Sequence, residues 1–178
     1  MSETALLVID MLNTYDHPDA GDLADHAEGM VGTLADLIGR ARERDDVDVI
    51  YVNDNHGDFS ADRRDLVRAA LDGERPDLVE PIAPGDDATF LTKVRHSAFY
   101  GTALDYLLGR LKTERVILTG QVTEQCILYT ALDGYIRHFD VIVPPDAVAH
   151  IYPDLGKAAL TLMERNMHAE LKSAVNCL

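Results

Sequence analysis

The amino-acid sequence predicts an α/β protein with a doubly wound, mostly parallel sheet of five to six strands and helices on both faces, a Rossmann-like three-layer sandwich. Short apolar segments of strand length alternate along the chain with amphipathic segments of helix length. The apolar segments lack the alternation of a half-exposed strand, so both of their faces are expected to be covered. Each strand also ends at a polar residue, which is typical of the ligand-binding edge of such a sheet.

The first half of the chain supplies three expected strands and two expected helices. In order, they are strand 5–9, helix 22–44, strand 47–52, helix 60–71 and strand 89–92. The first helix is predicted because apolar residues such as Leu23, Ala27 and Met30 recur every three or four positions. Ser60 is the expected cap of the second helix.

The second half continues the alternation. The expected elements are helix 102–112, strand 116–119, helix 123–137, strand 141–143, helix 154–166 and an edge strand at 169–175. Thr102 is the expected cap of its helix, and Pro144 and Pro145 end the fifth strand. Crossovers between parallel strands are expected to be right-handed.

Length, charge and cysteine content limit the class of protein. The 178 residues fit a single domain over residues 1–178, and the formal net charge of −15 argues against nucleic acid and anionic membranes as partners. We see no signal peptide and no apolar run near the ~18 residues of a membrane helix. Two cysteines are too few for a disulfide framework. We therefore expect a cytoplasmic protein that acts on a small molecule.

The segment VILTGQVTEQCILY, residues 116–129, is the centre of the functional prediction. It indicates a buried strand, a turn at Gly120 and a helix with Cys126 in its first turn. The amino end of a helix favours a thiolate and lowers a cysteine pKa, so Cys126 is a candidate nucleophile. The alternative is a buried structural cysteine, because free cysteines are among the most buried residues.

Asp10 and Lys93 also follow predicted strands and complete a possible catalytic set with Cys126. A carboxylate near the thiol accepts its proton, a lysine between them stabilises both anions, and helix N–H groups supply an oxyanion hole. These groups suffice for acyl transfer on a small amide. Taken alone, Asp10 could be a turn or cap residue and Lys93 a surface residue.

Asp54 and His56 are weak candidates for metal ligands in the polar loop after the second strand. Ordinary turn chemistry by Asn, Asp and Gly explains this loop at least as well. A zinc or iron site needs further ligands, and the next histidine along the chain is His96. We expect no metal and no other cofactor.

Four segments together resemble the isochorismatase-like cysteine hydrolases, a superfamily that includes nicotinamidases and N-carbamoylsarcosine amidases. These segments are LLVIDMLN, VIYVNDNHGDF, LTKVRHSAFYGTALDYLL and VILTGQVTEQCILYTALDGY. The resemblance implies that Cys126 is the nucleophile, Asp10 the general base and later acid, and Lys93 their electrostatic partner. It also implies a cis peptide bond at Gln121–Val122 and an oxyanion hole made of the Val122 and Cys126 N–H groups.

The resemblance further implies a substrate pocket, a reaction class and a homo-oligomer. The expected pocket residues are Asn13, Tyr15, Asn53, His96, Phe99, Tyr100, Thr123 and His150, each of which could instead serve the structure of its loop. The retained thiol favours a C–N bond of a small amide or carbamoyl compound. The alternative is vinyl-ether hydrolysis, which needs an acid and no nucleophile. Relatives suggest a homodimer or homotetramer, and a binding module or a redox sensor is a weaker alternative.

Overall fold

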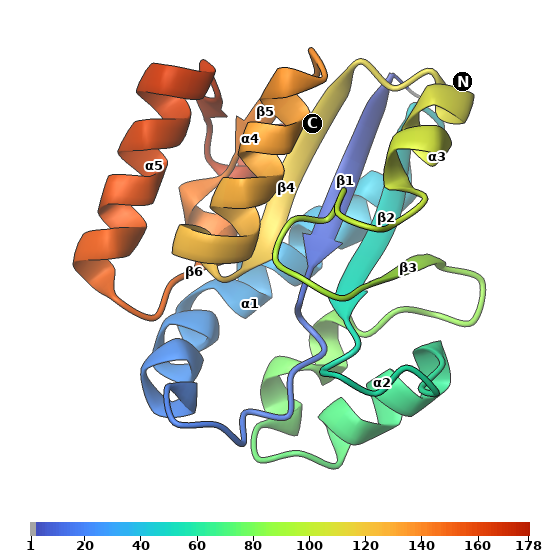
Figure 1. Ribbon diagram of the computed structural model, residues 1–178, viewed down its shortest axis with the longest axis vertical. Helices are drawn as coiled ribbons and strands as arrows, with labels where there is room; N and C mark the ends of the chain where they lie inside the picture. The colour runs from blue at the N-terminus through green and yellow to red at the C-terminus, as the bar shows by residue number, and fades with distance from the viewer. Residues whose placement is uncertain (1–2) are drawn as a thin grey trace.

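All paired strands of the sheet run parallel to one another. The computed structural model describes residues 3–178, and within them the sheet has seven strands in the order β3-β2-β1-β4-β5-β7, with β6 paired to β4 (Figure 1). The strands are β1 (Thr4–Ile9), β2 (Val47–Asp54), β3 (Thr89–Lys93), β4 (Arg115–Gln121), β5 (Asp140–Val143), β6 (Val148–Ala149) and β7 (Glu170–Leu171). The predicted α/β class is confirmed.

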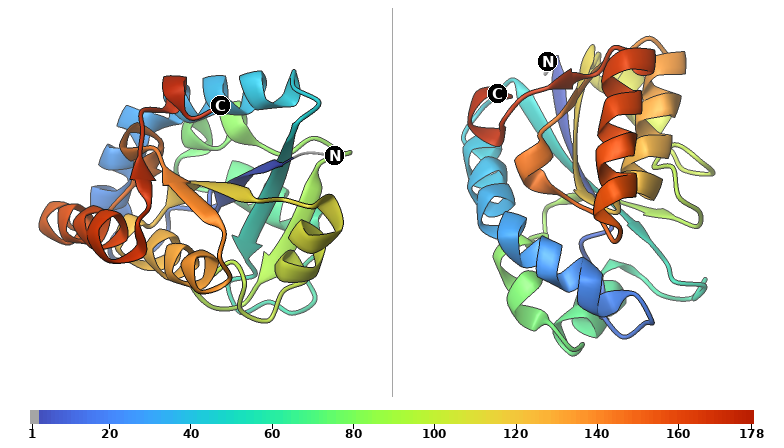
Figure 2. Two further views of the ribbon diagram at one scale, coloured as in Figure 1. Left: turned by 90° about the horizontal axis from the view of Figure 1, so that it is seen from above. Right: turned by 90° about the vertical axis from the view of Figure 1, so that its left-hand side faces the viewer.

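Helices cover both faces of this sheet. The longer ones are α1 (Ala20–Arg42), α2 (Arg63–Leu71), α3 (Leu104–Leu111), α4 (Leu128–Ile136) and α5 (Pro153–Met167). One apolar core joins α1 and α2 to one face of the sheet, and a second joins α3, α4 and α5 to the other face. Figure 2 shows the resulting three layers, with the sheet between α1 on one side and α4 and α5 on the other.

The centre of the sheet is the pair β1 and β4. Every residue of β1 is buried, and its register places Ile9 beside Gly120 on β4. On its other side β1 pairs with β2, so the strand order reverses direction between β1 and β4. In open α/β sheets such a reversal leaves a crevice at the carboxyl ends of the two strands.

The expected number of strands was too low because the sequence did not indicate β6, which is only two residues long and so shows no periodic pattern. The edge strand expected at 169–175 is confined to Glu170–Leu171, and a 3₁₀ turn, Ala174–Asn176, follows it. Further 3₁₀ turns span Pro76–Leu78, Glu80–Ile82 and Pro145–Ala147.

The expected start of α2 was also wrong. Asp62, not Ser60, caps this helix, because its carboxylate accepts the N–H groups of Arg64 and Asp65 while the Asp65 side chain accepts the Asp62 N–H. The Ser60 hydroxyl donates to Asp58 instead.

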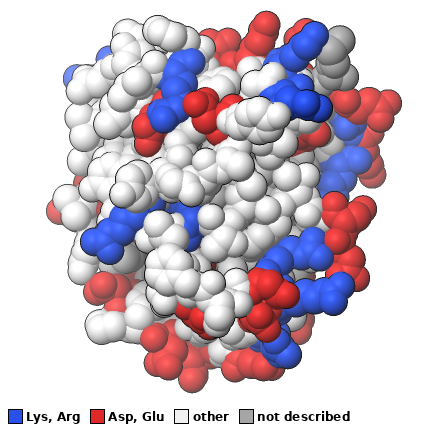
Figure 3. Space-filling view, turned by 45° about the vertical axis from the view of Figure 1, so that its right-hand side comes forward, with Lys and Arg blue, Asp and Glu red and all other residues white. Residues whose placement is uncertain are grey.

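The surface carries charges of both signs around a broad uncharged area. Figure 3 shows this in the view that brings the α3 side forward. Large apolar side chains on α3 and α4 are partly exposed, among them Tyr106, Leu132 and Ile136. The expected homodimer or homotetramer stays a prediction. No helix within residues 3–178 has the length and apolar character needed to cross a membrane.

Candidate active site

Lys93 lies at the centre of a cluster of ionisable side chains at the carboxyl edge of the sheet. It is the last residue of β3, and its side chain is fully buried. Its ammonium Nζ lies 2.8 Å from Oδ2 of Asp10, 3.4 Å from Oδ2 of Asp54 and 3.7 Å from Sγ of Cys126. Three side chains that are far apart in the sequence therefore meet at one buried cation.

The central ion pair of the cluster is largely buried, with the Lys93 side chain fully buried and that of Asp10 13% exposed. Burial lowers the pKa of Lys93, but the negative charges that face its ammonium, first that of Asp10, outweigh this effect, so the pKa lies above its ordinary value. Burial raises the pKa of the Asp10 carboxyl, and the opposing charge of Lys93 only partly offsets it. Asp10 thus holds a proton more readily than an exposed aspartate does, as an acid–base group must.

The main chain holds the Asp10 carboxylate in place. Asp10 follows β1 directly and has a left-handed backbone, with φ 53°. Its N–H donates to the Val52 carbonyl at 3.0 Å, and its Oδ1 accepts the Asp54 N–H at 2.8 Å. One carboxylate oxygen is therefore fixed by the main chain of β2, which leaves the other for Lys93.

Cys126 lies in a wide helical turn between β4 and α4. This turn, Thr123–Ile127, has π-helical geometry, and the Ile127 N–H donates to the Val122 carbonyl at 3.2 Å. The peptide bond Gln121–Val122, which the resemblance places in cis, is cis in the structure. The turn brings the Cys126 thiol, which is only 8% exposed, to within reach of Lys93.

The expectation that the helix start lowers the Cys126 pKa was wrong. Burial raises the pKa of the thiol well above its ordinary value, and the nearby Asp10 carboxylate raises it further. The charge of Lys93 and the Val122 N–H act in the opposite direction but do not prevail. This environment therefore favours the protonated thiol of Cys126, which needs a base to become a nucleophile.

A pocket of about 350 Å³ opens onto this cluster. Of the residues expected at the site, Asp10, Asn13, Asp54, His56, His96, Val122 and Cys126 line it. The sequence did not point to the other lining residues, which are His17, Leu23, Gln121, Gln125 and Ile151. Gln121 and Gln125 belong to the segment around Cys126, and their place in that segment is the signal that could have indicated them as pocket residues. His17 and Ile151 lie in two loops and Leu23 lies in α1, and the placement of all three depends on the tertiary fold.

Tyr15 and Asn53 support the pocket from behind and do not line it. The Asn53 side chain accepts the Leu12 N–H at 2.9 Å and donates to the Leu12 carbonyl at 3.2 Å. Tyr15 is buried, and its hydroxyl donates to Oε1 of Gln121 at 3.2 Å. Both side chains hold the loop after β1, and neither lines this pocket, so their contact with substrate stays a prediction.

The other four expected pocket residues also lie elsewhere. Phe99 is buried in the core, where its ring stacks on Phe139 with centroids 6.0 Å apart, and Tyr100 is 62% exposed. Thr123 is fully buried. His150 packs against His26, with ring centroids 3.9 Å apart. A loop aromatic can face a pocket, the core or water, and the sequence does not tell these apart.

Asp54 and His56 do not form a metal site with other side chains. Asp54 pairs with Lys93 and accepts the His56 N–H at 2.9 Å, while Nε2 of His56 lies 3.2 Å from the Leu12 carbonyl. Over residues 3–178, no group of three or more His, Cys, Asp or Glu side chains is arranged to hold a metal ion.

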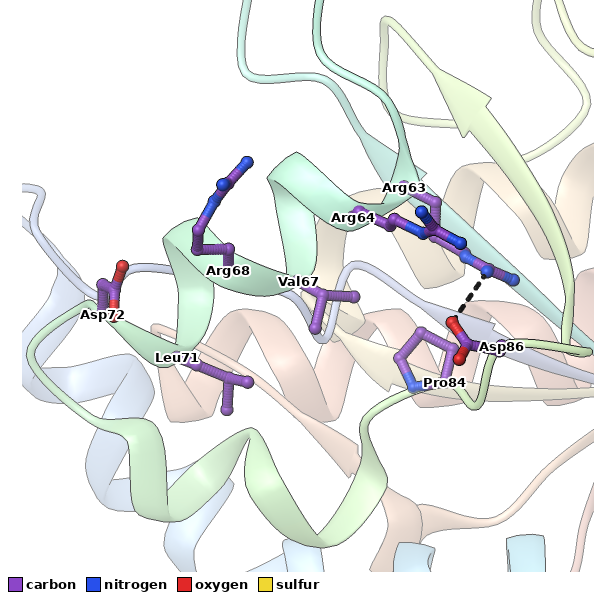
Figure 4. Close-up of a pocket in the computed structure, with 8 residues that line it drawn as sticks. All are labelled: Arg63, Arg64, Val67, Arg68, Leu71, Asp72, Pro84 and Asp86. Carbon is purple, nitrogen blue, oxygen red and sulfur yellow. Dashed lines mark ion pairs between the residues drawn. The ribbon is translucent and has the colours of Figure 1, made fainter.

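A second pocket, of about 290 Å³, lies between α2 and the loop that contains Pro84 and Asp86 (Figure 4). Arg63, Arg64 and Arg68 line it together with Asp86, whose carboxylate lies 3.5 Å from Arg63. None of its lining residues also lines the Cys126 pocket. Asp10 and Cys126 therefore line the pocket at the sheet edge and not the pocket beside α2.

Comparison with known proteins agrees with this geometry. Residues 4–174 match the family model described as the isochorismatase domain. The chain is 35% identical over 170 residues to YaaI, an uncharacterized isochorismatase family protein of Bacillus subtilis, and the match covers 96% of this chain and 93% of that protein.

Two solved structures are similar over nearly their whole length. An isochorismatase-like hydrolase from Alkaliphilus metalliredigens superposes with a TM-score of 0.79 at 25% identity, covering 98% of this chain and 96% of that one. The N-carbamoylsarcosine amidase from Thermoplasma acidophilum gives a TM-score of 0.75 at 28% identity, covering 98% and 97%.

Proposed function

This chain belongs to the isochorismatase family of hydrolases, and we propose that it is a cysteine hydrolase that cleaves the C–N bond of a small amide or carbamoyl compound. One observation carries the proposal. The buried ammonium of Lys93 lies 2.8 Å from the Asp10 carboxylate and 3.7 Å from the Cys126 sulfur. The likeness to an N-carbamoylsarcosine amidase supports the same bond type.

The first half of the reaction forms a thioester. Asp10 takes the proton of the Cys126 thiol, and the sulfur bonds to the carbonyl carbon of the substrate. The negative charge that develops on the carbonyl oxygen is stabilised by the N–H groups of Val122 and Cys126. The C–N bond then breaks, Asp10 returns the proton to the leaving nitrogen, and ammonia or an amine departs.

The second half regenerates the enzyme. Water adds to the thioester carbon and gives a proton to Asp10, whose raised pKa suits it to both steps. The C–S bond breaks, the acid product leaves, and the proton passes from Asp10 to the Cys126 sulfur. Throughout, Lys93 keeps its charge and balances whichever of its neighbours is anionic.

The lining of the pocket narrows the substrate class. It presents the imidazoles of His17, His56 and His96 and the amides of Asn13 and Gln125. Among the described residues no arginine lines this pocket, and the ammonium of Lys93 is already paired with two carboxylates. The part of the site next to Asp10 and Cys126 has a volume of about 350 Å³, near the lower limit for small-molecule sites, and a pocket of about 590 Å³ adjoins it through Asn13, His17 and His56. We therefore propose a small, neutral, polar substrate.

The test is ammonia release from a panel of small neutral amides, ureas and carbamoyl amino acids. Cys126→Ala is expected to abolish release, and addition of a chelator to the wild-type enzyme is expected to change nothing. Cys177→Ala is the matched control, because Cys177 is also buried but lies outside the pocket. Isochorismate cleavage that survives Cys126→Ala, with no amide turned over, would overturn the proposal in favour of vinyl-ether hydrolysis.

A further inference from the structure

The loop after β1 contains two residues in an unusual backbone conformation. Asp10 has φ 53° and Tyr15 has φ 54°, both in the left-handed region that residues other than glycine seldom adopt. Such conformations cost free energy and persist only where neighbouring groups impose them. The two residues mark the ends of the segment that carries the Asp10 carboxylate into the pocket.

A single side chain binds both of these residues. Gln121 is 1% exposed, and its Nε2 donates to the Asp10 carbonyl at 2.9 Å. Its Oε1 accepts the hydroxyl of Tyr15 at 3.2 Å. The amide thus uses its donor on one end of the loop and its acceptor on the other.

The close approach of β4 to β1 at Gly120 brings Gln121 near the end of β1. Gly120 has φ 104°, and a Cβ atom there would lie 2.1 Å from the carbonyl oxygen of Ile9. Glycine therefore allows the two strands to approach where Ile9 and Gly120 are paired. The next residues along each strand are Asp10 and Gln121, which face each other beside the pocket.

We propose that Gln121 is a positioning residue that sets the direction of the Asp10 carboxylate toward Lys93 and Cys126. This inference rests on the proposed role of Asp10 as the base. The Asp10 main chain has two polar anchors, its N–H on Val52 and its carbonyl on Gln121. We expect loss of the second to let the backbone leave the left-handed region and to shift the carboxylate on its contacts with the Asp54 N–H and Lys93.

The test compares Gln121→Leu, which keeps the approximate shape but removes both hydrogen bonds, with the wild-type enzyme. We expect kcat to fall between about tenfold and a hundredfold because the base is displaced. We expect KM to change less than about threefold, because Gln121, although it lines the pocket, is 1% exposed and both of its amide atoms bind Asp10 and Tyr15. Alkylation of Cys126 by iodoacetamide, measured in Cys177→Ala protein, should slow in parallel. A structural role alone would not change this rate in the folded protein.

Thr119→Val is the matched control. Thr119 is fully buried on β4, and its hydroxyl donates to the Leu7 carbonyl on β1 at 2.8 Å. The variant therefore removes one buried hydrogen bond between the same two strands without touching Asp10. We expect it to lower the melting temperature but to leave kcat and alkylation unchanged.

Tyr15→Phe keeps the test decisive if Gln121→Leu does not fold. It removes the hydroxyl that holds Gln121 while leaving the bond from Gln121 to Asp10. We expect kcat and alkylation to fall about two- to fivefold, more than in Thr119→Val. The proposal would be overturned if kcat and the alkylation rate of Gln121→Leu, or those of Tyr15→Phe, equalled the wild-type values. Because alkylation needs no substrate, it tests the positioning even if no amide is hydrolysed.

Discussion

The side chain of Lys93 is fully buried, yet its ammonium lies 2.8 Å from the carboxylate of Asp10. A buried charge is tolerated only when it is paired, and the pair adds little net stability over an apolar substitute. Removing one partner is different, because it leaves the other charge uncompensated. This asymmetry predicts which substitutions at the site affect folding as well as chemistry.

Lys93→Met is expected to lower the free energy of unfolding by about 3–5 kcal/mol, since it leaves the carboxylates of Asp10 and Asp54 without their cation. Urea denaturation measures the change. Lys172→Met is the control, because Lys172 pairs with Glu170 on the surface and its loss should cost no more than about 1 kcal/mol. Equal costs for the two variants would show that the Lys93 cluster is well hydrated.

Cys126→Ala is expected to lose less stability than the wild-type protein as the pH rises above 9. The folded pKa of Cys126 is raised above its ordinary value of 9.0, so the unfolded chain releases this proton first. The folded state then binds more protons, and its stability falls with pH. Urea midpoints at neutral pH and between about pH 9 and 11 measure the effect. Parallel curves for the two proteins would contradict the raised pKa.

Gly120→Ala is expected to destabilise the protein by at least about 3 kcal/mol. The new methyl group would collide with the Ile9 carbonyl, and φ 104° is unfavourable for alanine. Gly39→Ala on α1 has open space around its Cβ and should gain about 0.5–1 kcal/mol instead. Thermal unfolding of both variants makes the comparison. A mild effect at Gly120 would mean that β1 and β4 separate easily at their carboxyl ends.

Phe99→Ala is expected to cost about 3–5 kcal/mol of stability and to leave KM unchanged, because the ring fills the core between Phe139 and Arg137. Tyr100→Ala should change neither quantity, since Tyr100 is largely exposed and does not line the pocket. Denaturation and steady-state kinetics measure both variants. A rise in KM for Phe99→Ala would restore its sequence-based assignment to the pocket.

The sequence was sufficient to place Asp10, Lys93 and Cys126 together. Each follows an apolar strand, and parallel strands end at one edge of the sheet, so three local patterns imply one site. The class of fold followed from the same strands. In these cases the tertiary arrangement is a direct consequence of local sequence, and no knowledge of loop structure was required.

The walls of the pocket could not be predicted in this way. Phe99 and His96 lie in the same loop, yet one enters the core and the other lines the pocket. Their directions depend on packing against α4 rather than on residue type. The prediction of a lowered Cys126 pKa failed for a related reason. The start of a helix can be recognised in the sequence, but the burial that outweighs its effect on the pKa cannot.

The pairing of β1 with β4 has a consequence for how the chain acquires its chemistry. Gln121 contacts Asp10, although 111 residues separate them in the sequence. The strands β2 and β3, which lie between them in the sequence, are on the side of β1 opposite to β4. A fragment that ends before β4 can therefore contain Asp10 and Lys93 but never the thiol. Contacts of such long range carry a larger loop-closure cost than local contacts do. Cys126 reaches its position beside Lys93 only when β4 has paired with β1. The environment of this thiol therefore reports that the centre of the sheet has formed.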